Sequence, residues 1–301
     1  MKIFKTFAAA LILLAGATAC DSNDNPDFDP NIKLVLNPNV SFTTAKDLST
    51  GEWSVFEAPT YSFDINTSTF NASLKVEKLT YAEGKTASFT ISGLALTIDP
   101  KDNAWTISNN SQLVVKDENG ASHEITGFNA YIFSSGRAPE IVRVEYTLDN
   151  AHKIRAVMKF NAFMGKTTVA SSRPGMESFE WEKAVYFLIL DQKTQKAKVL
   201  LYEAKFADKM PRTMDMNFLS HPFTVNDNGL SIDVPEKFEP ENNNIPNSTY
   251  AVTDFKLLLN PCRTLAGTFT CGGAFDVTVD TTSAIAIDSE TLRKMTVEMG
   301  K

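Results

Sequence analysis

The chain has 301 residues, of which 36 are acidic and 29 are Lys or Arg, and its formal net charge is −7. This length accommodates two domains of ordinary size. An acidic chain repels phosphate backbones, so we expect no nucleic-acid partner.

Residues 1–19 have the pattern of a secretory signal peptide. Lys2 and Lys5 precede the apolar run Phe7–Ala15, and small residues lie directly before Cys20. The run is too short to span a bilayer, which takes about 20 apolar residues. Residues 20–31 are acidic and almost free of apolar side chains. Such a segment cannot bury a hydrophobic core, which predicts a flexible tether.

The small residues followed by Cys20 resemble a bacterial lipobox, whose cysteine becomes the lipidated first residue of the mature protein. The acidic residues after Cys20 resemble the surface-export signal of Bacteroidota lipoproteins. These resemblances imply that a lipid on Cys20 anchors the protein in the outer membrane and that the protein is displayed at the cell surface. The alternative is retention in the inner membrane, which acidic residues after the cysteine signal in other bacteria.

The remainder of the chain contains one stretch twice. Residues Ser73–Ile107 align with Lys198–Ile232 at an offset of 125, and the same offset pairs Tyr61 with Tyr186. Matches at similar offsets run from about residue 40 to residue 282. Because a repeat of this length corresponds to a whole domain, we predict two domains of the same topology, residues 32–162 and 163–301.

Short runs of alternating apolar residues, separated by turn signals, fill both copies and predict antiparallel strands. In the first copy the alternation slips by one residue after Val76, and in the second copy it slips at the matching place after Leu201. A β-bulge inserts one residue and produces such a slip. We therefore predict bulges at residues 77–78 and 202–203.

The predicted fold class is all-β: two tandem antiparallel domains, each a barrel or a sandwich, followed by a short helix over Ser289–Met299. About eight strands in about 120 residues resemble the calycin (lipocalin-like) barrels of Bacteroidota lipoproteins. Two sandwiches, as in fimbrial subunits of the same bacteria, are the alternative.

The two copies also indicate which aromatic side chains are exposed. Trp53 aligns with Glu177, so we expect Trp53 to be exposed. It is the candidate ligand contact, because an exposed indole can stack on a sugar ring. Trp105 aligns with Leu230 and is expected in the core. The alignment does not decide on which side of its strand Trp181 lies.

No motif for catalysis or metal binding is present. The histidines, His123, His152 and His221, are far apart in the sequence, and no nucleophile is paired with a base at a recognisable spacing. We therefore expect no enzymatic activity, no metal and no cofactor. Cys271 falls in the apolar phase of a strand, and its pairing with Cys262 stays open because a strand separates the two.

Two functions of different classes follow from these observations. The first is a lipid-anchored cell-surface binding module for a glycan, a small hydrophobic molecule or a host protein. The second is a structural or accessory subunit of a surface assembly such as a fimbria. An unpaired apolar edge strand near Ile32–Leu36 would favour the second, because an open edge can pair with another chain.

Overall fold

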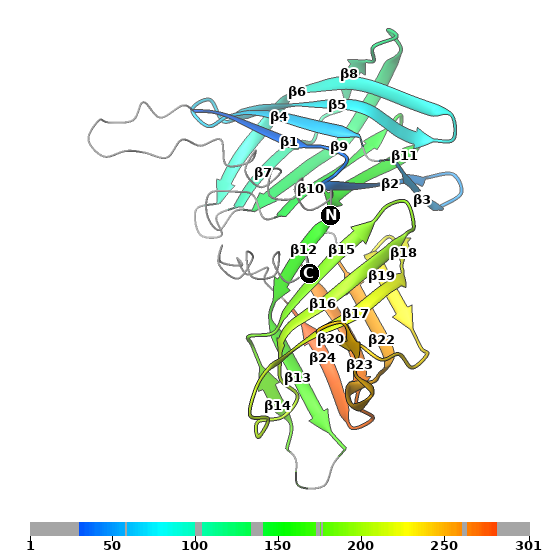
Figure 1. Ribbon diagram of the computed structural model, residues 1–301. Helices are drawn as coiled ribbons and strands as arrows, with labels where there is room; N and C mark the ends of the chain where they lie inside the picture. The colour runs from blue at the N-terminus through cyan, green and yellow to red at the C-terminus, as the bar shows by residue number, and fades with distance from the viewer. Residues whose placement is uncertain are drawn as a thin grey trace, which may run out of the picture. The chain divides into compact units, whose positions relative to one another are not determined.

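The computed structural model describes residues 30–57, 59–99, 104–133, 141–172, 175, 177–260 and 264–281 (Figure 1). The predicted signal peptide, most of the predicted tether, Cys20, Cys262 and the predicted helix Ser289–Met299 lie outside these residues. The chain divides between Met158 and Lys159 into two compact units. They are called here the N-terminal unit (residues 30–158) and the C-terminal unit (residues 159–281).

Both units are built from antiparallel strands, and the predicted all-β fold class is confirmed. Within the described ranges the only helical element is the short 3-10 turn η1 (Ser248–Tyr250). None of the sheets closes into a barrel, so the architecture is consistent with a sandwich. No helix of the described residues is long and apolar enough to cross a membrane.

One 11-stranded sheet forms the N-terminal unit, in the order β1-β4-β5-β6-β7-β9-β10-β11-β2-β3, with β8 paired to β9. Its strands are β1 (Asn31–Leu36), β2 (Ser41–Asp47), β3 (Trp53–Phe56), β4 (Thr60–Asn66), β5 (Asn71–Ala82), β6 (Lys85–Asp99), β7 (Ala104–Asn109), β8 (Leu113–Lys116), β9 (Ser122–Phe133), β10 (Ile141–Leu148) and β11 (His152–Met158).

Two sheets form the C-terminal unit, in the orders β12-β15-β16-β17-β20-β21 and β14-β13-β24-β23-β22-β19-β18. Their strands are β12 (Phe160–Met164), β13 (Lys166–Ser171), β14 (Phe179–Trp181), β15 (Val185–Asp191), β16 (Lys196–Ala204), β17 (Met214–Pro222), β18 (Thr224–Asn226), β19 (Gly229–Val234), β20 (Glu241–Asn242), β21 (Ile245–Pro246), β22 (Val252–Leu259), β23 (Leu265–Cys271) and β24 (Phe275–Asp280).

The two units repeat the same strand pairing. Each pairing along the path from β1 to β3 has a counterpart, beginning with β1–β4 and β12–β15 and ending with β2–β3 and β13–β14. The long strand β6 corresponds to β17 and β18 together, and the break at Phe223 divides the second unit into two sheets. The strand that begins the second unit is β12, so the division at residues 158–159 falls shortly before the predicted boundary at 162–163.

Both predicted β-bulges are confirmed. The register of β5 against β6 and that of β16 against β17 shift at residues 77–78 and 202–203. Lys78 and Glu203 have left-handed backbones, with φ of 60° and 52°. The Lys78 N–H donates to the Ser88 hydroxyl at 3.0 Å, and the Glu203 N–H donates to the Asp215 carboxylate at 2.8 Å. A side chain thus satisfies the backbone donor that each bulge releases.

A buried hydroxyl pair recurs in the two cores. The Tyr61 hydroxyl lies 3.3 Å from the Thr43 hydroxyl, and the Tyr186 hydroxyl lies 3.1 Å from that of Thr167. In the N-terminal unit these residues belong to β4 and β2, which lie near opposite ends of the strand order. The sheet therefore curls until its two ends face each other across one core, which supplies the second layer that a single sheet lacks.

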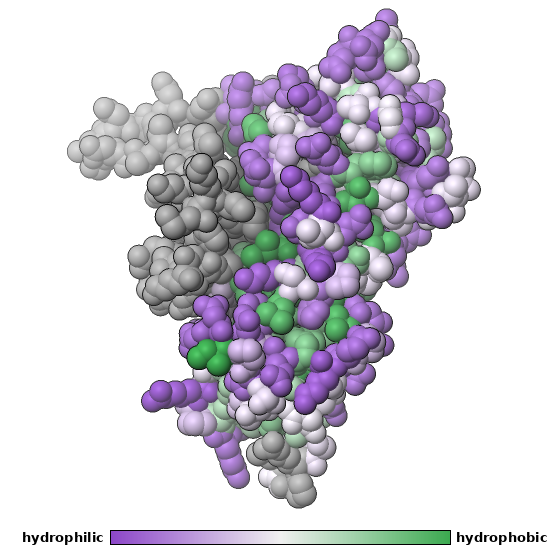
Figure 2. Space-filling model, turned by 45° about the vertical axis from the view of Figure 1, so that its right-hand side comes forward, coloured by the Kyte–Doolittle hydropathy of each residue, from purple (hydrophilic) through white to green (hydrophobic). Residues whose placement is uncertain are grey.

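Few large apolar side chains are exposed on the described surface. Val35, Leu48, Phe70, Val114 and Ile245 are the large apolar residues that the described surface exposes. The face in Figure 2 is mainly hydrophilic, with apolar residues in small groups. A few exposed apolar residues and small apolar groups are normal on a protein surface, so this pattern by itself marks no interface.

Candidate functional site

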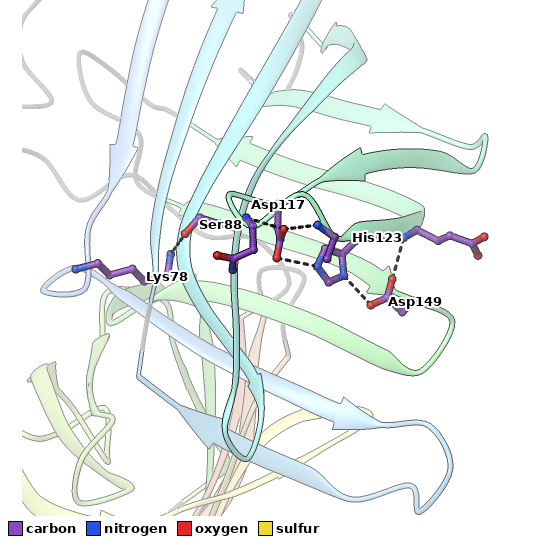
Figure 3. A network of polar contacts seen from close by, with 8 residues as sticks. Lys78, Ser88, Asp117, His123 and Asp149 are labelled. Carbon is purple, nitrogen blue, oxygen red and sulfur yellow. Dashed lines mark hydrogen bonds and ion pairs between the residues drawn. The ribbon is translucent and has the colours of Figure 1, made fainter.

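A buried histidine lies between two carboxylates at one end of the N-terminal unit (Figure 3). Nδ1 of His123 is 2.8 Å from Oδ2 of Asp149, and its Nε2 is 3.6 Å from Oδ2 of Asp117. The His123 and Asp117 side chains are 9% and 6% exposed, whereas that of Asp149 is 35% exposed. The buried His123 and Asp117 side chains thus lie behind the Asp149 carboxylate, which is accessible to water.

Asp117 closes the turn between β8 and β9. Its Oδ1 accepts the backbone N–H groups of Asn119 at 2.9 Å and Ala121 at 2.7 Å. Burial acts to raise the pKa of Asp117, but these donors and His123 outweigh it and the pKa is lowered. The carboxylate therefore stays ionised beside the imidazole and fixes the start of β9, where His123 lies.

Asp149 is fixed by the turn between β10 and β11. Asp149 and Asn150 have φ of 54° and 51°, the pair of left-handed residues that a tight hairpin needs and that Asp and Asn tolerate. The Glu124 N–H donates to Oδ1 of Asp149 at 2.9 Å, and the Asp149 N–H donates to the Glu124 carbonyl at 2.8 Å. With His123 on Oδ2, both carboxylate oxygens are positioned before any ligand arrives.

The half-buried Tyr81 ring lies between two histidine rings. The Tyr81 ring lies 6.2 Å from His123 and 5.3 Å from His152, centroid to centroid. Burial, and then the charges of Asp149 and Asp117, raise the pKa of Tyr81, so its hydroxyl is neutral at pH 7. The Asn150 amide donates to the Glu124 carboxylate at 2.8 Å. Rings, carboxylates and an amide therefore meet at one end of the unit.

The C-terminal unit has the same backbone here without the polar groups. The Gly272 N–H donates to the Ala251 carbonyl at 2.8 Å, which repeats the bond from Asp149 to Glu124. Counting on from the matched strand registers, four positions of the two units correspond: Tyr81 with Phe206, His123 with Tyr250, Asp149 with Gly272 and His152 with Phe275. Phe206 packs on Phe275 at 6.2 Å and on Tyr250 at 6.0 Å. Aromatic packing therefore suffices to close this end of the fold.

Trp53 is less exposed than its alignment with Glu177 predicts. The strand register places Trp53 opposite Lys46, and the matching register of β13 and β14 is one residue away from that alignment. The indole is half-buried, with the Arg155 guanidinium 4.4 Å and the Lys46 ammonium 6.0 Å from its ring centroid. The prediction of an exposed ring was therefore wrong, because one slipped residue changes the neighbours of a strand side chain.

The other two tryptophans have contacts within their own units. Trp105, expected in the core from its match with Leu230, packs against the core and is half-buried; it lies opposite Ile132. The Trp181 indole N–H donates to the Glu203 carbonyl at 2.8 Å, so Trp181 bridges from the edge strand β14 to the bulge in β16. The contacts of Trp105 and Trp181 are thus with residues of their own units.

Neither Cys271 nor His221 belongs to a polar site. Cys271 is buried, and burial raises the pKa of its thiol to about 12, which makes it unreactive. His221 is buried among Phe238 and Phe255, and burial lowers its pKa. Within the described ranges, no group of three or more His, Cys, Asp or Glu side chains is arranged to hold a metal ion.

Sequence reasoning missed the His123 site. Asp149 lies 26 residues from His123 and on a different hairpin, so no local motif joins them. One signal was available, since His152 aligns with Phe275 and Tyr81 with Phe206. A polar residue in one copy that aligns with an apolar residue in the other marks a position where the two units differ in chemistry, and such a position is a candidate for a site in one unit alone. No family model, curated protein or solved structure matches this chain.

Proposed function

We propose that the protein is a lipid-anchored cell-surface binding module, and that the Asp149 end of its N-terminal unit binds a hydroxyl-rich ligand such as a glycan. The carboxylate of Asp149 is 35% exposed and held from both sides. A fixed carboxylate accepts hydrogen bonds from sugar hydroxyls, and the half-buried rings of Tyr81 and His152 offer aromatic surface of the kind on which a sugar ring packs. Preorganisation lowers the entropy that binding costs.

The observation that carries this proposal is the difference between the two units. The C-terminal unit closes the same end with Phe206, Tyr250 and Phe275. Burying a histidine between two aspartates gives no more stability than such packing and often less. Stability therefore does not account for the polar groups of the N-terminal unit, and ligand binding does.

The anchor belongs to the same proposal. Cys20 would carry the lipid, and the chain enters the fold at Pro30, next to the β4–β5 turn, where the Thr67 N–H donates to the Pro30 carbonyl at 2.9 Å. Ten residues of extended chain reach about 35 Å. A tether of that length lets the folded units clear the headgroups while they stay close to the membrane.

A structural or accessory subunit is the second candidate. The strand β1 ends its sheet and pairs with β4 on one side, and Val35 on this strand is 45% exposed. An edge of this kind can accept a strand from another chain. Lys33 on the same strand opposes such pairing, since edge lysines are a common device against it.

Calorimetry with the full mature chain tests the glycan site. The probes are amylose, xylan, mannan and mucin-type O-glycans. Asp149→Gly keeps the left-handed turn, as Gly272 does in the C-terminal unit, and should weaken binding of the recognised saccharide about tenfold or more. Asp64→Asn, a change at an exposed aspartate on β4, is the matched control and should bind as the parent does. Equal binding by Asp149→Gly and the parent would contradict the proposal.

A further inference from the structure

The edge strand β14 of the C-terminal unit carries two aromatic rings close together. Phe179 and Trp181 are alternate residues of β14, so their side chains leave the strand on the same face. Their ring centroids are 6.1 Å apart, their planes are 23° from parallel, and both side chains are half-buried. Among the described strands, β14 pairs with β13 and ends the sheet. The bond from the Trp181 indole to the Glu203 carbonyl therefore fixes a ring pair at an edge of the unit.

Two lysine ammonium groups lie beside these rings. Nζ of Lys205 is 5.4 Å from the ring centroid of Phe179 and 5.3 Å from that of Trp181, and Nζ of Lys183 is 5.8 Å from that of Trp181. A ring face attracts a cation but carries no net charge that would neutralise it. In the part of the chain that the structure describes, neither ammonium group forms an ion pair, and Glu180, the acidic residue within β14, pairs instead with a lysine of β13. The four residues are called here the Trp181 platform: Phe179, Trp181, Lys183 and Lys205.

The N-terminal unit forms the same edge without this arrangement. Counting from the buried hydroxyl pairs and from the two bulges, three positions correspond: Ser54 with Phe179, Phe56 with Trp181 and Thr80 with Lys205. At these positions the N-terminal unit has one ring and no lysine, and the Thr80 hydroxyl bonds to that of Thr86 at 3.2 Å. The fold therefore closes this edge without a second ring or a cation, and the Trp181 platform needs another reason.

We infer that the Trp181 platform binds an acidic saccharide, with a carboxylate or sulfate on Lys183 and Lys205 and a sugar ring against the aromatic pair. An ammonium group donates strong hydrogen bonds to an anionic oxygen, and the apolar face of a sugar packs on aromatic surface. The preference for an anion rests on the two lysines, whereas the identification of a saccharide rests on the cell-surface function proposed above. In a chain of net charge −7, a local cationic site also directs an acidic ligand to one place.

Calorimetric titration of the full mature chain tests this inference. The probes are a heparin tetrasaccharide, a polygalacturonate oligomer, neutral dextran, a poly-glutamate peptide and inorganic sulfate. We expect the parent to bind one of the two acidic saccharides, more weakly as salt rises, and to bind no other probe comparably. Lys183→Gln and Lys205→Gln should each weaken that binding about tenfold, because each removes a hydrogen bond between charged groups. Phe179→Ser, which copies Ser54, should weaken it too. Lys237→Gln, at an exposed lysine of the same unit, is the control and should bind as the parent does.

Three results would overturn the inference: no binding of either acidic saccharide by the parent, unchanged binding by both lysine variants, or an equal loss in the Lys237→Gln control. Sulfate or poly-glutamate bound as tightly as the saccharide would also overturn it, since the site would then hold a simple ion or an acidic peptide. Asp149→Gly separates the two proposals, because it should leave binding of the acidic saccharide to the Trp181 platform intact. The urea unfolding midpoint of Lys183→Gln, at an exposed side chain, should equal that of the parent and shows that lost binding is not lost folding.

Discussion

Glu145→Gln tests whether the Glu145 carboxylate stabilises the N-terminal unit through its ion pairs with Arg143, Lys153 and Arg155. Burial acts to raise the pKa of Glu145, but Arg143 and Lys153 outweigh it and lower the pKa from 4.5 to about 2. At 1.36 kcal/mol per pKa unit this difference corresponds to about 3 kcal/mol of stability at pH 7. Because the carboxylate is partly exposed, solvent screening reduces the expected loss on substitution to about 2 kcal/mol.

The sign of the pH dependence follows from the lowered pKa. The stabilisation is fully present above pH 4.5 and is lost as the pH falls through about 2. The difference between the parent and Glu145→Gln should therefore be largest at pH 7 and should shrink from pH 4.5 downwards. Urea unfolding followed by tryptophan fluorescence measures it in a Trp181→Phe background, where Trp53 and Trp105 report the N-terminal unit alone.

Glu77→Gln is the matched control for this experiment. Glu77 contacts Lys75 at 2.7 Å, and the two side chains are 42% and 57% exposed. Such a surface pair contributes about 0–1 kcal/mol, so the control should unfold nearly as the parent does. A loss below about 0.5 kcal/mol for Glu145→Gln, or a loss of the same size at pH 7 and pH 3, would refute the reasoning.

Three further predictions concern the fold. Phe70 is 54% exposed with φ of 51°, so Phe70→Gly should raise the free energy of unfolding by about 0.5–1 kcal/mol in urea titrations, and a decrease would show that the ring packs on something. Tyr61→Phe and Tyr186→Phe should each lower the free energy of unfolding of their own unit by about 1–2 kcal/mol. Trp53 and Trp105 report the N-terminal unit and Trp181 reports the C-terminal unit, and a loss in both units would refute this prediction. Because the pKa of His221 is lowered, the C-terminal unit should lose stability as the pH falls below about 6.5; His221→Leu, monitored by Trp181 fluorescence, should remove that dependence.

Local pattern alone predicted the strands and their bulges. An inserted residue changes which face every later side chain meets, so the slip after Val76 and again after Leu201 is visible in the alternation of apolar residues. Comparison of the copies likewise paired Trp105 with Leu230 correctly. Barrel and sandwich were not distinguished, because both use the same alternation in each strand and differ only in how the ends of the sheet meet.

Only the tertiary structure decided the polar sites. His123, Asp117 and Asp149 come from the β8–β9 and β10–β11 hairpins, and the pairing of β9 with β10 brings the two turns together. The contact of the Arg155 guanidinium with the Trp53 ring likewise depends on the pairing of β11 with β2, strands at opposite ends of the unit's sequence. Alternation shows which side chains share a face of one strand. It does not show which strand lies beside it, because that choice depends on the free energy of the whole core.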